Sequence, residues 1–158
     1  MKRHILRSVT LAVAAISLVP FTARGADVSI LGHWRIAEAQ PAPWSPPDER
    51  ENLAAAGKRM IDTEVTFAPG SVKSKFKPWD CKSKVIYTAN SIEVDALFQG
   101  NLPEPNPAAA AVHLGFPKGG DVRGVDVRCL KAQFTFHFRD PDTAMINFGR
   151  VIYTLKRQ

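Results

Sequence analysis

The residues that could take part in catalysis or metal binding are few. They are two cysteines, two histidines in the second half of the chain and five aspartates. The cysteines are Cys81 and Cys129, and no others occur in the 158 residues. His113 and His137 lie far from the cysteines and from each other, so the set lacks the close ligand spacing of a zinc site. The aspartates are Asp80, Asp121, Asp126, Asp140 and Asp142.

These side chains do not form a recognised catalytic pattern. Asp140 and Asp142 flank a proline in a turn and supply fewer oxygen ligands than a Ca²⁺ loop needs. The sequence contains neither a Gly-x-Ser-x-Gly elbow nor a His-Glu-x-x-His helix. We therefore expect a non-enzymatic protein without a metal or cofactor, with an enzyme of unfamiliar site as the alternative.

The two cysteines are predicted to form a disulfide. An even cysteine count is typical of exported proteins, because the oxidising compartments outside the cytoplasm favour the bridge. Cys81 and Cys129 would close a loop of about 49 residues, which the chain-entropy model values at roughly 4 kcal/mol. A catalytic thiol is the alternative, and the same oxidising compartment disfavours it.

Residues 1–25 are predicted to be a cleaved signal peptide. They combine a basic start, an apolar run at 9–21 and two small residues, Ala23 and Gly25, at the spacing read by a signal peptidase. The apolar run is shorter than the roughly 20 residues of a membrane span, so an uncleaved anchor is the weaker alternative. We expect a periplasmic or secreted domain at 26–158 with no membrane span.

Signal cleavage removes most of the positive charge. The formal net charge of +6 falls to +2 once the four basic residues Lys2, Arg3, Arg7 and Arg24 are lost. The remaining bases are scattered, and such a domain has no strong field to attract nucleic acid. We expect no nucleic-acid partner, and the sequence does not indicate an oligomeric state.

The clearest structural signal is a strand at 132–139. Phe134, Phe136 and Phe138 alternate with polar residues, which indicates one buried and one solvated face. His137 falls on the second set, so we expect it at the surface. Turn residues at 140–143 and two further apolar runs separated by Gly149 predict consecutive antiparallel strands to the end of the chain.

The rest of the chain predicts further short strands and little helix. Strands are expected at 28–38, 59–67, 72–77, 82–88 and 92–98, with turns at 68–71 and 89–91. Short helices are expected within 45–59 and 106–115, the second acting as a lid over a barrel mouth or as a plain cap. The predicted fold is mainly β: an antiparallel up-and-down β-barrel or cup of about eight strands with one or two short helices, in a single domain at 26–158.

The residues Gly32-His33-Trp34 in the first strand resemble the opening Gly-x-Trp of the lipocalin and calycin group. That resemblance rests on these residues and the strand count, and the Thr-Asp-Tyr motif of lipocalins is absent. It implies that Trp34 plugs the closed end of the barrel, that the first strand closes against the last, and that a basic residue packs over the indole. Arg150 is the first choice for that residue and Arg157 the second. Without the resemblance, Trp34 is a core anchor of a small β domain.

Small barrels either hold one small ligand or fill themselves with side chains. We expect a small apolar ligand, because aromatic residues are abundant along the predicted inner face. The residues expected to line its site are Trp34, Phe134, Phe136, Phe138 and Phe148.

A protein-binding module, such as an inhibitor of a periplasmic hydrolase, is the second functional hypothesis. The Pro-rich loop at 42–47 would then present Trp44 to the partner, although Trp44 could equally pack onto the barrel.

Three lysines alternate along one predicted strand: Lys73, Lys75 and Lys77. They indicate either a solvated edge strand protected by lysine or a surface for an acidic partner.

Overall fold

The computed structural model describes residues 29–130 and 132–158, so the signal peptide predicted at 1–25 lies outside the described residues. The described residues form one antiparallel sheet of eight strands in the order β3-β2-β1-β8-β7-β6-β5-β4. The strands are β1 (Gly32–Pro41), β2 (Glu64–Ala68), β3 (Ser71–Ser74), β4 (Ile86–Glu93), β5 (Asp121–Cys129), β6 (Ala132–Asp140), β7 (Thr143–Phe148) and β8 (Val151–Arg157).

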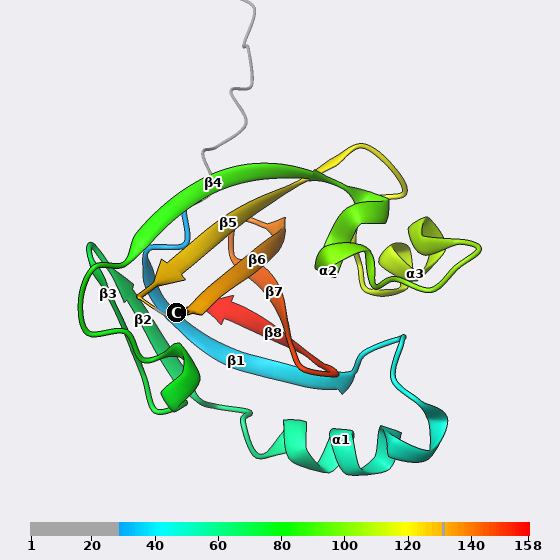
Figure 1. The fold of residues 1–158 in the computed structure, drawn as a ribbon, viewed down its shortest axis with the longest axis horizontal. Helices are drawn as coiled ribbons and strands as arrows, with labels where there is room; N and C mark the ends of the chain where they lie inside the picture. Colours follow the sequence, from blue (N-terminus) through cyan, green and yellow to red (C-terminus); the bar gives the residue numbers. More distant parts are fainter. Residues whose placement is uncertain (1–28, 131) are drawn as a thin grey trace, which may run out of the picture.

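The sheet is an up-and-down arrangement that curls into a half-barrel (Figure 1). All its neighbouring strands are consecutive in the sequence except β1 and β8, which bring the two ends of the described chain together. β3 and β4 are left as the two edges of the sheet. The mainly β cup and the pairing of the first strand with the last are confirmed.

Short helical segments connect the strands. Within the described residues they are η1 (Pro47–Glu49), α1 (Arg50–Lys58), η2 (Lys77–Trp79), η3 (Val94–Ala96), α2 (Leu97–Gly100) and α3 (Pro107–His113). α1 approaches β1 so closely that a Cβ on Gly57 would stand 3.0 Å from the Cβ of Ala39. The Asn106 side chain accepts a hydrogen bond from the Ala109 N–H at 2.9 Å and caps α3. No helix among the described residues has the length and apolar character to cross a membrane.

The predicted turn at 89–91 is wrong, and so is the strand predicted after it. β4 continues through these residues and pairs with β5 from Ile86 to Glu93. Asn90 can stay in the ladder because it faces Gly124, where even a Cβ would collide with the Asn90 Oδ1. The chain then leaves the sheet at Val94 and coils into η3 and α2.

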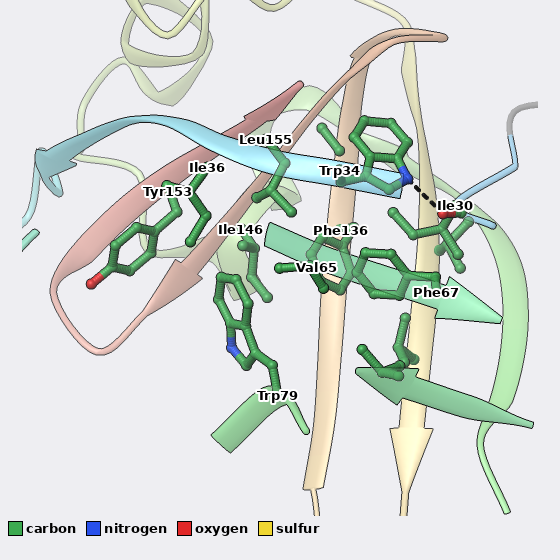
Figure 2. Close-up of a cluster of buried hydrophobic side chains, with 14 of the residues drawn as sticks. Ile30, Trp34, Ile36, Val65, Phe67, Trp79, Phe136, Ile146, Tyr153 and Leu155 are labelled. Carbon is green, nitrogen blue, oxygen red and sulfur yellow. Dashed lines mark hydrogen bonds between the residues drawn. The ribbon is translucent and has the colours of Figure 1, made fainter. Parts of the chain in front are cut away.

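The concave face of the half-barrel is filled by an inner cluster of apolar side chains (Figure 2). The largest members are aromatic, and they come from strands on both sides of the curl and, in the case of Trp79, from η2. The cluster includes Trp34, Ile36, Val65, Phe67, Trp79, Val127, Phe136, Phe138, Ile146, Tyr153 and Leu155.

An outer cluster buries the other face of the sheet. The segment from 94 to 116, with η3, α2 and α3, lies over side chains of β5, β7 and β8. Its members are Ala42, Val94, Leu97, Phe98, Leu102, Ala111, Leu114, Phe116, Val122, Met145 and Ile152, and Trp44 and Ile92 pack at its rim. β8 consequently has consecutive buried residues from Val151 to Leu155, with both of its faces covered.

The two edges of the sheet meet at a seam made by the segment between β3 and β4. Val72 and Cys81 exchange two backbone hydrogen bonds of 2.8 Å. The Tyr87 hydroxyl on β4 lies 2.9 Å from the Ala68 carbonyl oxygen and 2.8 Å from that of Ser71. The Cys81–Cys129 disulfide, with a Cα–Cα distance of 6.1 Å, fastens this seam to β5 as predicted.

Candidate functional site

The predicted ligand-lining phenylalanines lie on the concave face, as their alternation indicates. Phe136 and Phe138 are buried and Phe134 is half-buried. The Phe136 ring packs edge-to-face on Phe67, with 5.2 Å between centroids. Phe148 lies at the rim, 38% exposed, with its ring 5.0 Å from that of Phe76. These rings contact other side chains and so make up the filling of the cup.

Trp34 closes one end of the inner cluster. Its indole N–H donates to the Ile30 carbonyl at 2.7 Å, and the indole is fully buried (Figure 2). The guanidinium of Arg157 lies 4.4 Å from the ring centroid, a cation–π contact. The same guanidinium donates to the carbonyl oxygens of Leu31 and Ser29 and pairs with Asp142.

The expected choice of Arg150 as the cation over Trp34 is wrong, and the second choice, Arg157, is correct. In the antiparallel β1–β8 pair, Trp34 stands opposite Arg157 at the end of β8. Arg150 precedes β8 at the far end of that pair, where it forms an ion pair with Glu49.

Trp79 lies across the inner cluster from Trp34 (Figure 2). It is carried by η2, in the segment that forms the seam, and its ring contacts four aromatic rings at centroid distances of 5.2 to 6.5 Å. Those rings belong to Phe76, Phe134, Phe136 and Tyr153. The buried indole N–H of Trp79 has no hydrogen-bond partner among the described residues. Trp79 therefore fills the space that the predicted lining residues surround.

Trp44, the predicted partner-binding residue, packs at the rim of the outer cluster, so it lies against the domain itself, the second of the two positions expected for it. It is half-buried, with its ring 5.8 Å from that of Phe98 in the outer cluster. The loop around it is fixed, because the Ser45 hydroxyl donates to the Arg150 carbonyl at 3.0 Å.

The surface position predicted for His137 is wrong, since this side chain is only 1% exposed. It lies on the face opposite the phenylalanines, as expected, but the outer cluster covers that face. Its Nε2 accepts a hydrogen bond from the Phe98 N–H at 3.3 Å, and Nδ1 has no partner among the described residues. Burial lowers the pKa of His137 to about 4, against a smaller opposing effect of the Asp126 charge.

Asp121, Asp126 and Asp140 are engaged in structural contacts. Asp126 accepts a hydrogen bond from the Thr135 hydroxyl at 2.6 Å, and Asp140 accepts one from the Asp142 N–H at 2.9 Å. Asp121 accepts from the Ser91 hydroxyl at 3.0 Å. In the described residues no three His, Cys, Asp or Glu side chains are grouped to hold a metal ion.

A cleft of about 690 Å³ opens on the outside of the seam, beside β2 and β3. We call it the lysine cleft, because its charged lining residues are Lys73, Lys75, Lys77 and Lys82 together with Glu64 and Asp80. The four lysines are exposed. Three of them are the alternating lysines of the sequence. Lys82 could not have been grouped with them from the sequence, because the Val72–Cys81 bridge is what brings it alongside.

Comparison of the chain with protein-family models, with curated proteins and with solved structures gives no match.

Proposed function

We propose that this chain is an exported, non-enzymatic protein-binding module of the periplasm, such as an inhibitor of a hydrolase, and that it works through its outer surface. The observation that carries this proposal is the filled concave face. Trp34, Ile36, Phe136 and Leu155 are all buried to within 1% there, with Trp79 packed among the rings. A cup filled by its own side chains is a rigid scaffold, and rigid scaffolds present surfaces for recognition.

The export part of the proposal rests on two observations. The Cys81–Cys129 disulfide is typical of an oxidising compartment outside the cytoplasm. The signal-peptide pattern at 1–25 supplies the route of export.

Partner capture followed by reconstitution tests the proposal. Residues 26–158, oxidised and immobilised, are incubated with a periplasmic extract of the source organism, and bound proteins are identified by mass spectrometry. We expect a protein that, once purified, forms a stoichiometric complex with the domain in calorimetry. If that protein is a hydrolase, its activity should fall in proportion to complex formed.

The matched control is the same domain with both cysteines replaced by alanine and unfolded in urea before coupling. Proteins bound equally by folded and unfolded chains are non-specific. If every captured protein falls in that class, the binding-module proposal is wrong.

Carriage of a small apolar ligand is a second candidate, favoured by one feature of Trp79. Its buried N–H lacks a described partner, and burying an unpaired donor costs roughly 1–3 kcal/mol. A ligand that displaced Trp79 from its place against Phe134 and Phe136 would release that cost. Titration with the uncharged fluorophore N-phenyl-1-naphthylamine separates the two functions. Stoichiometric binding to the wild-type domain supports carriage, whereas binding only to Trp79→Ala supports the filled scaffold.

A further inference from the structure

We propose that the lysine cleft binds an acidic segment of the partner protein. This inference rests on the proposed function and names the surface and the partner chemistry. The cleft is large enough, since roughly 300 Å³ is the lower range for binding pockets and this one measures about 690 Å³.

The lysines of the cleft form no ion pair among the described residues. The ion pairs among described residues join Arg35 to Asp62, Arg150 to Glu49 and Arg157 to Asp142, and none includes a lysine of the cleft. Four lysines face two acids there, so the cleft carries a formal charge of +2. The Asp80 carboxylate already accepts a hydrogen bond from the Ser74 N–H at 3.3 Å.

Protection of an edge strand does not explain these lysines. Lysines on an edge prevent another chain from pairing with free backbone groups. On the outer edge of β3, Val72 already pairs with Cys81 through both its N–H and its carbonyl. The next N–H on that edge, at Ser74, is taken by Asp80. Because this edge is already capped, the exposed ammonium groups beside it are free to serve an external partner.

The lysines of the cleft come from short pieces of chain with different conformations. Lys73 lies on the outer face of β3, since its neighbours Val72 and Ser74 are buried, but β3 ends at Ser74 and the strand predicted at 72–77 is wrong beyond that residue. Lys75 follows in a bend, Lys77 begins η2, and Lys82 lies beyond the Val72–Cys81 bridge. Because the lysines do not share one strand, the cleft selects a segment by its negative charge and not by a fixed spacing of its carboxylates.

Fluorescence anisotropy with defined peptides tests the charge preference. One fluorescein-labelled peptide contains four glutamates and three threonines, and a second has glutamine in place of each glutamate. We expect the domain to bind the glutamate peptide at least about tenfold more tightly than the glutamine peptide, with affinity falling as NaCl is raised.

The test variant carries Lys73→Glu, Lys75→Glu, Lys77→Glu and Lys82→Glu. It should lose at least about tenfold in affinity for the glutamate peptide. The matched control, with the same change in net charge, carries Lys58→Glu, Arg59→Glu, Lys118→Glu and Arg128→Glu at exposed positions away from the cleft. It should stay within about twofold of wild type. A second cleft variant with four Lys→Gln changes, checked by circular dichroism, keeps the test valid if charge reversal prevents folding.

Three results would overturn the inference. They are equal binding of the two peptides, equal losses in the cleft and control variants, or tighter lysine-dependent binding to heparin, duplex DNA or anionic vesicles. Repeating the partner capture with the cleft variant separates this inference from the proposed function. If wild type and variant recover the same specific partner equally, the module function stands and the cleft assignment falls. If neither recovers a specific partner, the module function itself falls.

Discussion

The inner and outer clusters bury opposite faces of the same sheet but are held in different ways. The inner cluster lies between strands that are joined by backbone ladders and, at the seam, by the Cys81–Cys129 disulfide. The outer cluster lies under a segment of irregular backbone, in which Phe98 and Gln99 have φ angles of +53° and +60°. That segment is tied to the sheet by the hydrogen bond from the Phe98 N–H to His137.

One half of the fold is therefore fixed by strand pairing and the disulfide, and the other half mainly by side-chain packing. Residues in paired strands are held by many backbone hydrogen bonds, whereas the segment from 94 to 116, the outer cover, is held by apolar contacts and few hydrogen bonds. We therefore expect loss of the disulfide to destabilise the whole domain. Changes at His137 and Gln99 should act mainly on the outer cover.

Loss of the disulfide should have the largest effect. Cys81→Ala with Cys129→Ala is expected to lower the free energy of unfolding by about 4 kcal/mol, because the unfolded chain regains the entropy of a long loop. Urea denaturation followed by tryptophan fluorescence measures the loss. Tyr87→Phe, which removes the hydroxyl at the same seam, should cost about 1 kcal/mol. If the double cysteine variant loses less than about 1 kcal/mol, the hydrogen bonds at the seam hold the two edges together without the disulfide.

Acid should weaken the protein through His137. Its pKa is about 4 in the folded protein and 6.5 in an unfolded chain, so between these values the unfolded state binds more protons. Stability is therefore lost as pH falls from 6.5 to 4, by up to about 3 kcal/mol, and the loss levels off below that window. Denaturation in urea at a series of pH values should show this slope in wild type and not in His137→Gln.

His113→Gln is the matched control for that experiment, because His113 is exposed. It should retain the wild-type pH dependence. A slope that persists unchanged in His137→Gln would mean that other groups produce it.

The two tryptophans of the inner cluster should respond differently to the same substitution. Trp34→Phe removes the donor to the Ile30 carbonyl and part of the surface under Arg157, and we expect a loss of about 2–3 kcal/mol. Trp79→Phe also leaves space, but it removes an N–H that lacks a described partner, so its net cost should be about 1 kcal/mol or less. Equal losses in urea denaturation would contradict this difference.

The inner cluster could be predicted from the sequence, but the outer cluster could not. The alternation of Phe134, Phe136 and Phe138 depends only on neighbouring residues, and it correctly identified the concave face. The burial of His137 depends on the segment from 94 to 116. The apolar residues of that segment come in short runs without a clear helical or strand periodicity. Alternation predicts that two faces differ, but it does not reveal that a distant segment covers the polar one.

The candidate site shows the same division. The outward direction of Lys73 could be predicted from alternation along β3. The end of that strand at Ser74, which leaves Lys75 in a bend and Lys77 in η2, could not. The packing of Trp79 against Phe134 and Phe136 could not be predicted either, since it requires η2 to fold back across the seam. Whether the cup was filled or open depended on that one long-range contact.

The smallest effect should come from relieving the backbone of the outer cover. Gln99 is exposed and has φ +60° and ψ +34°, a left-handed conformation that costs a residue with a side chain more than it costs glycine. Gln99→Gly should raise the free energy of unfolding by about 0.5 kcal/mol, the relief outweighing the extra freedom that glycine gives the unfolded chain. Urea denaturation in replicate measures the change. Gln133→Gly, at an exposed position in β6, is the control and should instead destabilise by roughly 1 kcal/mol, because glycine weakens a regular strand. If both variants lose stability equally, the cover is not strained at Gln99, and the outer cluster is held more like the inner one than its backbone indicates.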